Sequence, residues 1–294
     1  MSIQSALNPA GPDAAVIAEI TWVLFAGGAA VFVLVMALAA WAVVKPPPWL
    51  ARRGAIVVGG IAFPAIVLLA LLVYTLLRAN ALSAGEPALR VEVTGHQWWW
   101  RIAYLTDDGA VDFVTANELR IPVAQPVEIR LRSADVLHSF WVPSLAGKLD
   151  LIPGKDNRLV LAASRAGIFR GQCAEYCGGP HAQMAFYVVA TQGFEEWRAR
   201  QRPPAAASND LFNARCGVCH ALRGTPAAGT LGPDLTHVGG RVSIGAGILP
   251  NNRGALAGRI ASSQHLKPGN LMPSFRELSG EELTSLAAYL ESLQ

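Results

Sequence analysis

Two long stretches without a charged side chain constrain the fold of this chain more than any other feature of its sequence. From Ile20 to Val44 there are 25 consecutive uncharged residues, and from Gly54 to Leu77 there are 24. A bilayer core about 30 Å thick needs about 20 helical residues to cross it. The sequence therefore predicts a hairpin of two transmembrane helices, over about residues 17–44 and 54–77.

The charges around these stretches predict how the hairpin is oriented. The connecting segment Lys45–Arg53 holds three prolines and three cations, which predicts a tight cytoplasmic turn. The tail before Ile20 has no Lys or Arg and carries Asp13 and Glu19, so it lacks the basic start of a signal peptide. We expect a membrane protein whose N-terminus and later domains lie on the outer side.

The overall composition excludes several classes of protein. Only 15% of the 294 residues are charged, against about 25% in soluble domains. The net charge of +3 is too small for a strongly basic nucleic-acid binder, and four cysteines are too few for a disulfide scaffold. We divide the chain into the tail and hairpin (1–85), a middle domain (86–200), a proline-containing linker (201–207) and a C-terminal domain (208–294).

The middle domain has a sequence pattern typical of a β-sandwich or barrel. Its apolar residues fall in short alternating runs, separated by turn signals such as Asp107-Asp108-Gly109 and Pro153-Gly154.

A group of soft metal-binding side chains lies within this domain. Cys173 and Cys177 are four residues apart, His181 follows four later and Met184 three after that, and His138 lies 35 residues upstream of Cys173. Thiolates, imidazoles and a thioether select copper or zinc over hard cations. The cysteines alone would also suit a disulfide, a structural zinc site with the two histidines, or plain buried thiols. Met184 and the separate His138 favour copper.

The pattern C-x-E-x-C-x3-H-x2-M resembles the dinuclear copper A motif of cytochrome c oxidase subunit II. The resemblance extends over residues 95–100, 135–139, 142–145 and 150–154, and the order of a hairpin before a cupredoxin-like domain is the same. It implies two copper ions with these ligands: bridging thiolates from Cys173 and Cys177, imidazoles from His138 and His181, the thioether of Met184 and the main-chain carbonyl of Glu175. It also implies that the Glu175 carboxylate reaches a magnesium ion shared with subunit I.

Two further positions follow from the same resemblance. Trp98 matches the aromatic residue at which electrons enter the copper site from cytochrome c. It is the first of three adjacent tryptophans, which we expect to alternate between the faces of one strand, with at least one pointing outward. Many family members carry a Glu seven residues before a proline of the second membrane helix. Alignment on Pro64 places Val57 there. That Glu is associated with a proton path, so the entrance of this path is in doubt in this chain.

The C-terminal domain carries the attachment signature of a c-type haem, Cys216-Gly217-Val218-Cys219-His220. Two thiols add to the haem vinyl groups, and the adjacent His is held under the iron. A zinc or thioredoxin-type site is the alternative, but zinc would need two more ligands and no further cysteine remains.

The sixth iron ligand should be Met or His. Met272 lies in a segment that resembles the distal loop of class I cytochromes c, and it is favoured over His265 and His237. Ser208 is a candidate N-cap for a helix over 209–215, and Ser279 with Glu282 forms a capping box before an apolar helical face. These features predict an all-α mono-haem domain.

The whole chain resembles subunit II of a caa-type oxidase with a fused cytochrome c domain. The resemblance implies single-electron transfer from a cytochrome c or cytochrome bc complex to haem c, then to copper A, then to haem a of subunit I. Oxygen reduction at haem a and copper B belongs to subunit I, and subunit III is a further expected partner. The alternatives are the matching subunit of a copper A nitric oxide reductase and a membrane-tethered electron carrier.

Overall fold

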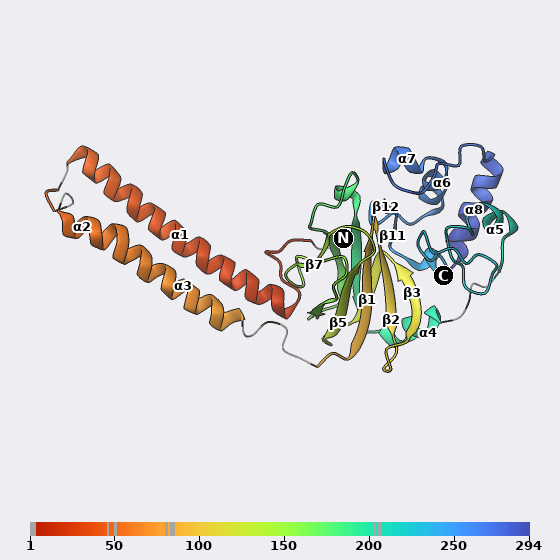
Figure 1. Ribbon diagram of the computed structural model, residues 1–294, viewed down its shortest axis with the longest axis horizontal. Coiled ribbons are helices and arrows are strands. Elements are labelled where there is room, and N and C mark those ends of the chain that lie inside the picture. The colour runs from red at the N-terminus through yellow and green to blue at the C-terminus, as the bar shows by residue number, and fades with distance from the viewer. Residues whose placement is uncertain are drawn as a thin grey trace. The chain divides into compact units, whose positions relative to one another are not determined.

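The computed structural model describes residues 4–45, 47–49, 52–79, 82, 86–202, 204 and 207–294. The chain forms two compact units (Figure 1): Asp13–Ala84 is one, and Met1–Pro12 with Gly85–Gln294 is the other.

The first unit is a hairpin of two apolar helical segments that run antiparallel (Figure 1). Helix α1 spans Pro12–Val44, and the second segment comprises α2 (Arg53–Val57), a π-helical turn (Val58–Ala62) and α3 (Phe63–Ala79). Both segments are long and apolar enough to cross a bilayer, which agrees with the prediction. Helix α1 begins earlier than predicted, and the second segment extends past both of its predicted ends. Within the predicted connecting turn, residues 46, 50 and 51 lie outside the described residues.

The π-helical turn has a local cause in the sequence. Pro64 has no N–H to donate to the carbonyl of Gly60 four residues earlier, and its ring would clash with that carbonyl in a regular α-helix. Gly59 and Gly60 give the backbone the freedom to widen just before the proline. Val57, the position that the resemblance aligns with a Glu, ends α2 directly before this turn and is exposed.

The middle domain is a sandwich of two five-stranded sheets, as predicted. One sheet has the order β3-β2-β1-β5-β8 and the other β4-β10-β9-β6-β7. The strands of the first are β1 (Leu89–His96), β2 (Trp99–Leu105), β3 (Val111–Ala116), β5 (Val127–Ser133) and β8 (Asn157–Leu161). Those of the second are β4 (Glu118–Pro122), β6 (His138–Trp141), β7 (Leu149–Leu151), β9 (Gly167–Cys173) and β10 (Ala185–Thr191). Alternate residues of each strand face the shared apolar core.

Two segments outside the sheets complete this core. Helix α4 (Phe194–Gln201) packs Trp197 against the rings of Tyr104 and Phe113. The tail before α1 packs against the same domain. Ala10 is buried, its N–H donates to Ser144 O (2.7 Å), and its carbonyl accepts from Ser164 N (2.7 Å).

The C-terminal domain is mainly helical, as predicted, with α5 (Asp210–Arg215), α6 (Arg253–Ala261), α7 (Ser263–Leu266) and α8 (Gly280–Ser292). It also holds a small ribbon of β11 (Ser243–Ile244) and β12 (Leu249–Pro250). The capping box of α8 forms as predicted. The cap of α5 does not: Asn209, not Ser208, accepts from Phe212 N (2.9 Å), because its side chain stands three residues before that free amide.

The linker proposed between the two domains follows α4, which ends at Gln201. Residues 203, 205 and 206 of this linker lie outside the described residues. The two domains also touch directly, since Glu118 Oε2 of β4 accepts from Val242 N (2.6 Å) and Arg120 donates to Gly240 O (3.0 Å).

Candidate metal centre and haem pocket

The predicted copper ligands meet at one end of the β-sandwich. Cys173 is the last residue of β9, and the loop from it to β10 supplies Cys177, His181 and Met184. His138 begins β6, which pairs with β9 so that Phe140 lies opposite Cys173. Strand pairing therefore brings together residues that are 35 positions apart in the sequence.

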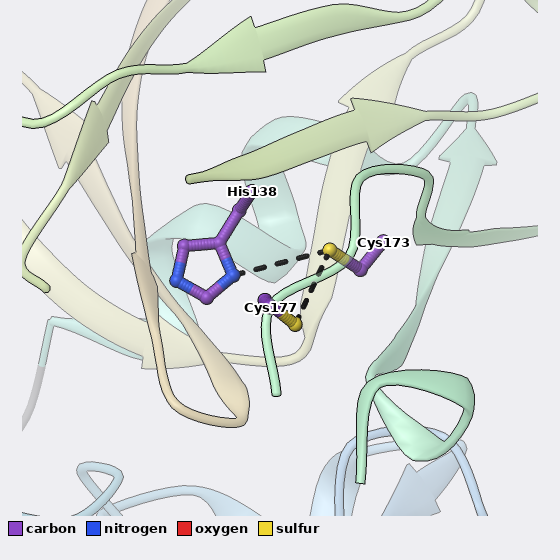
Figure 2. A group of neighbouring side chains, drawn as sticks. All are labelled: His138, Cys173 and Cys177. Carbon is purple, nitrogen blue, oxygen red and sulfur yellow. Dashed lines mark hydrogen bonds between the residues drawn. The ribbon is translucent and has the colours of Figure 1, made fainter. Parts of the chain in front are cut away.

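The donor atoms of these five side chains contact one another directly. His138 Nδ1 lies 3.9 Å from Cys173 Sγ, and the two sulfur atoms are 3.7 Å apart (Figure 2). Cys177 Sγ in turn lies 3.3 Å from His181 Nδ1 and 3.8 Å from Met184 Sδ.

One main-chain oxygen joins this group of donors. Cys173 Sγ is 3.2 Å from the carbonyl oxygen of Glu175. His138, both cysteines and Met184 are buried. Both thiols are free, so the disulfide alternative does not hold in this structure. A buried set of two thiols, two imidazoles and a thioether fits copper better than a hard cation.

The thiols and His138 shift each other's protonation. The contact with Cys177, followed by the hydrogen bonds with His138 and nearby main-chain groups, lowers the pKa of the Cys173 thiol although burial opposes this. Burial lowers the pKa of His138, but its contacts with Cys173 and Asp135 outweigh this and raise the pKa. The site therefore favours a thiolate at Cys173, which is the form that binds soft metals.

Two neighbours fix the orientation of the His138 ring. Its Nε2 bonds Asp135 Oδ1 at 2.7 Å, so Nδ1 is the nitrogen that faces the thiols. On the other side, a Cβ placed on Gly95 would come within 2.7 Å of the ring. Only glycine leaves room for the imidazole there. A carboxylate behind a ligating histidine also raises its strength as a ligand.

Trp98 and its neighbour Gln97 hold the loop that carries Cys177. Trp98 Nε1 and Gln97 Nε2 both donate to the Cys177 carbonyl, each at 2.8 Å. The expectation that three tryptophans share one strand is wrong, because Gln97 and Trp98 form the turn between β1 and β2. Trp98 is partly exposed, whereas Trp100 is fully buried beneath the site against Phe140 and Phe186.

The carboxylate of Glu175, expected to reach magnesium, points away from the thiols to a lysine. Lys148 Nζ lies 3.3 Å from Glu175 Oε2 and 3.3 Å from Asp150 Oδ1. Glu175 therefore presents a carboxylate at the exposed rim of the site while its carbonyl faces the centre.

In the C-terminal domain, the C-x-x-C-H segment follows α5 and places His220 in a buried setting. His220 Nδ1 contacts Pro233 O at 2.8 Å, which leaves Nε2 for an iron. A Cβ on Gly232 would come within 2.6 Å of the imidazole, so the segment of Gly232 and Pro233 packs closely against the ring. Burial lowers the pKa of His220, so the ring is neutral at pH 7, as an iron ligand must be. Burial also raises the pKa of Cys216 to about 11.

Met272 is the candidate sixth ligand that the domain core holds in place. It packs against that core, its N–H donates to Asn270 Oδ1 (2.9 Å) and its carbonyl accepts from Gln264 Nε2 (2.7 Å). The other two candidates are placed differently: His265 is exposed, and His237 Nδ1 contacts Gln294 O at 2.7 Å.

Two partly buried arginines test whether this domain suits a haem. Arg241 Nε is buried with no hydrogen-bond partner among the described residues, and burial lowers the pKa of Arg241 and that of Arg259, the latter to about 10. The charges of both arginines also contribute to the lowered pKa of His220. Positive charge buried near the candidate iron ligand suits a group with carboxylates, and haem carries two propionates. The residues present therefore fit a haem.

Sequence reasoning missed three residues that support these sites. Asp135 and Gln97 lay within the quoted motif but received no role. Lys267 received none either, although its amino group reaches the carbonyls of Trp98 and Gln183. A lone lysine gives no sequence signal for such a contact.

Comparison with known proteins gives two family matches. Residues 107–191 match the family described as cytochrome c oxidase subunit II, periplasmic domain, and residues 205–294 match cytochrome c. Cytochrome c oxidase subunit 2 of Alkalihalophilus pseudofirmus is 38% identical over 71% of this chain and 63% of its own length. The same subunit of Bacillus sp. strain PS3 is 33% identical over 79% of this chain and 72% of its own length.

The matched region is therefore just under two thirds of the first relative. Among solved structures, the periplasmic domain of subunit II of the Bradyrhizobium japonicum cytochrome oxidase is 31% identical. It covers 40% of this chain and 96% of its own, with a TM-score of 0.37.

Proposed function

This chain belongs to the cytochrome c oxidase subunit II family, and from that premise we propose that it is the subunit through which electrons enter a terminal respiratory oxidase. The observation that carries the proposal is the buried chain of contacts from His138 through both thiols to His181 and Met184. A site of this composition suits a soft, redox-active metal.

We propose that the site holds two copper ions. They would be held by the thiolates of Cys173 and Cys177 and the imidazoles of His138 and His181, with Met184 and the Glu175 carbonyl as weak ligands. Sharing one electron between two bridged metals keeps bond lengths nearly constant, which is the chemistry the coppers supply when bound. Asp135 orients His138, and Gln97 and Trp98 fix the loop around Cys177.

The C-terminal domain holds one haem c in the same proposal. Cys216 and Cys219 would form the thioether links to it, and His220 and Met272 would ligate its iron. Pro233 and Gly232 keep the His220 ring in one orientation, and Asn270 holds the backbone of Met272.

The direction of electron flow follows from the order of these groups. We propose that, with both cofactors bound, this chain would accept electrons at haem c from a cytochrome c or cytochrome bc complex and deliver them through the copper A site to haem a of subunit I. Trp98 is the aromatic side chain at which electrons reach copper A, and its hydrogen bond to Cys177 O supports this role.

The packing of the tail supports the proposed orientation in the membrane. Because Ala10 lies in the core of the β-sandwich, the tail and the sandwich share one side of any membrane that the chain crosses. An even number of crossings is then required, and two candidate spans lie between them. Together with the cations of Lys45–Arg53, this supports the proposal that both metal domains lie outside a bacterial inner membrane.

The remaining proposals concern the partner subunits. Subunit I, with haem a and copper B, is the electron acceptor and the site of oxygen reduction and proton translocation. Subunit III is a further neighbour. The exposed Glu175 carboxylate would meet magnesium at the subunit I interface, where it would exchange Lys148 for the ion. A proton path that usually starts at a Glu would need another entrance near Val57.

The decisive experiment is the haem and metal content of the purified membrane complex. We expect two coppers and one covalent haem in this chain, co-purifying with haem a and a subunit that reduces oxygen to water. A complex that reduces nitric oxide and not oxygen would assign the chain to a nitric oxide reductase. A chain that purifies alone with both centres would make it a tethered carrier.

The order of electron flow has its own test. Stopped-flow reduction by the native donor, followed at separate wavelengths, should show haem c reduced before copper A. We expect Trp98→Ala to leave both spectra intact and to slow haem-to-copper transfer severalfold or more. Copper A reduced first would contradict the proposed order.

A further inference from the structure

The haem domain has a single lysine, Lys267, and this lysine is buried at the contact with the copper domain. It is only 2% exposed. Its Nζ donates to Trp98 O at 2.7 Å and to Gln183 O at 2.8 Å, and both acceptors belong to the copper domain. No carboxylate pairs with it among the described residues. Burying an amino group costs several kcal/mol unless it is hydrogen-bonded, so the position of Lys267 needs an explanation.

The two acceptors lie beside the proposed copper ligands. Gln183 immediately precedes Met184, and Trp98 bonds the carbonyl of Cys177 through its indole N–H. Gln183 also donates from Nε2 to Leu266 O at 3.3 Å, so each domain donates a hydrogen bond to the other.

The haem domain makes a second contact on the other side of Met184. Ala185 N donates to Ala246 O at 3.0 Å. Next to it, a Cβ on Gly247 would come within 2.9 Å of Ala185 Cβ, so the two backbones are in close contact. Met184 thus lies between two residues that are each bonded to the haem domain.

Lys267 also connects to the proposed haem ligand. Its carbonyl accepts hydrogen bonds from both the main-chain and the side-chain nitrogen of Asn270, and Asn270 Oδ1 accepts from Met272 N. One short path of hydrogen bonds therefore runs from the loop of Met272 to the residue next to Met184.

From this geometry we propose that Lys267 is a positioning residue, which clamps the loop of Met272 onto the backbone around Met184. This inference rests on the proposed function. Docking of the haem domain then sets how the Met184 sulfur approaches copper and, at the same time, fixes the separation of the two redox centres. Copper A properties become dependent on a domain that supplies no copper ligand.

The clamp does not depend on the charge of the amino group. Burial, with Arg259 nearby, lowers the pKa of Lys267 to about 7, and Cys177 opposes this shift. A neutral amine still has two N–H groups, and the site offers two carbonyl acceptors. The hydrogen bonds are what the clamp requires.

Lys267→Met in the intact oxidase tests the proposal, because methionine keeps much of the length and removes both donors. We expect a changed copper A electron paramagnetic resonance spectrum and haem-to-copper transfer slowed about tenfold or more, in the range typical of lost second-sphere contacts. The haem c spectrum and the content of both metals should stay unchanged. Lys155→Met, at an exposed lysine of the copper domain, is the matched control.

A second variant guards against a misfolded Lys267→Met. Gly247→Ala adds a methyl group at the other contact, next to Ala185, and should produce the same pair of changes. The proposal is overturned if both variants carry wild-type amounts of haem and copper and keep the wild-type copper spectrum and transfer rate. A wild-type complex without two coppers or without haem c would instead overturn the proposed function, so the two failures are distinguishable.

Discussion

The copper site and the haem pocket hold their ligands in different ways. In the β-sandwich, the candidate ligands contact each other, from His138 through Cys173 and Cys177 to His181 and Met184. In the helical domain, each ligand is held by its own neighbour. His220 is bonded to Pro233, and Met272 is bonded to Asn270 on a separate loop.

The difference reflects the size of the group each site is built for. Two metal ions need donors a few ångströms apart, and strand pairing can supply that spacing without further support. A haem is as large as several side chains, so its ligands come from distant loops, and the haem becomes part of the core between them. We therefore expect the β-sandwich to fold independently of copper and the helical domain to depend on haem.

The largest expected effect is the loss of the haem links. Replacing Cys216 and Cys219 by alanine should abolish covalent haem, detected by haem staining after denaturing electrophoresis. The helical domain should become sensitive to protease because it loses part of its core. The content of two coppers per chain should remain. A protease-resistant helical domain would contradict the dependence on haem.

The mirror experiment removes a copper bridge. Cys173→Ser should abolish the mixed-valence copper spectrum, because a hydroxyl cannot replace a bridging thiolate. The haem c spectrum and the protease resistance of the β-sandwich should stay at wild-type levels, since the strands supply most of its apolar core. An unfolded sandwich would show that the metal is needed for that fold as well.

A smaller effect is expected at the residue behind the ligand. Asp135→Asn keeps the shape of the side chain and removes the negative charge that faces His138 Nε2. Copper affinity should fall about tenfold to a hundredfold, as is usual for such partners. Competition with a copper chelator measures it. Asp156→Asn, at an exposed carboxylate in the loop before β8, is the control and should leave affinity unchanged.

The smallest effect concerns the scaffold alone. Asp112 of β3 pairs with Arg198 and Arg202 at the end of α4, at 3.0 Å in each case. Asp112→Asn should lower the free energy of unfolding of the sandwich by about 1–3 kcal/mol, with both cofactor spectra unchanged. Thermal unfolding monitored by tryptophan fluorescence checks it, and Glu196→Gln on the exposed face of α4 should have no effect.

The ion pairs of Asp112 also predict how the stability loss in Asp112→Asn depends on pH. Burial opposes ionisation of Asp112, but the two arginines outweigh it and lower its pKa below the usual 3.8. A carboxylate with a lowered folded-state pKa stabilises the fold above its unfolded-state pKa, and this contribution is lost as the pH falls through the folded-state pKa. The difference between Asp112→Asn and wild type should therefore be full at pH 7 and shrink below about pH 4.

Much of this architecture could be predicted from the sequence because its signals are local. Uncharged runs indicate membrane helices, alternation indicates strands, and the spacings of Cys173 and Cys216 from their neighbours indicate the chemistry of each site. The contacts that could not be predicted join distant segments. Lys267 bonds carbonyls that are 84 and 169 residues away, and no local pattern encodes such a meeting.

The errors at Trp98 and Ser208 have a common physical origin. Apolar runs predict a strand but not the residue at which the strand ends. The turn between β1 and β2 lies at Gln97 and Trp98, whose side chains both donate hydrogen bonds to the Cys177 carbonyl. At α5, Ser208 and Asn209 are both good caps. The geometry of the first turn selects the one whose oxygen reaches Phe212 N.

The burial of Ala10 has a consequence for the order in which the molecule is made. Its hydrogen bond with Ser164 joins segments about 150 residues apart, and both candidate membrane spans lie between them. During synthesis, the tail emerges before the strands that follow α3, and its partner Ser164 does not exist until those strands have been made. Such distant contacts form late. The tail therefore closes the sandwich only after the whole hairpin has been made. On the proposed topology, completion of this domain would also report that both spans have been inserted.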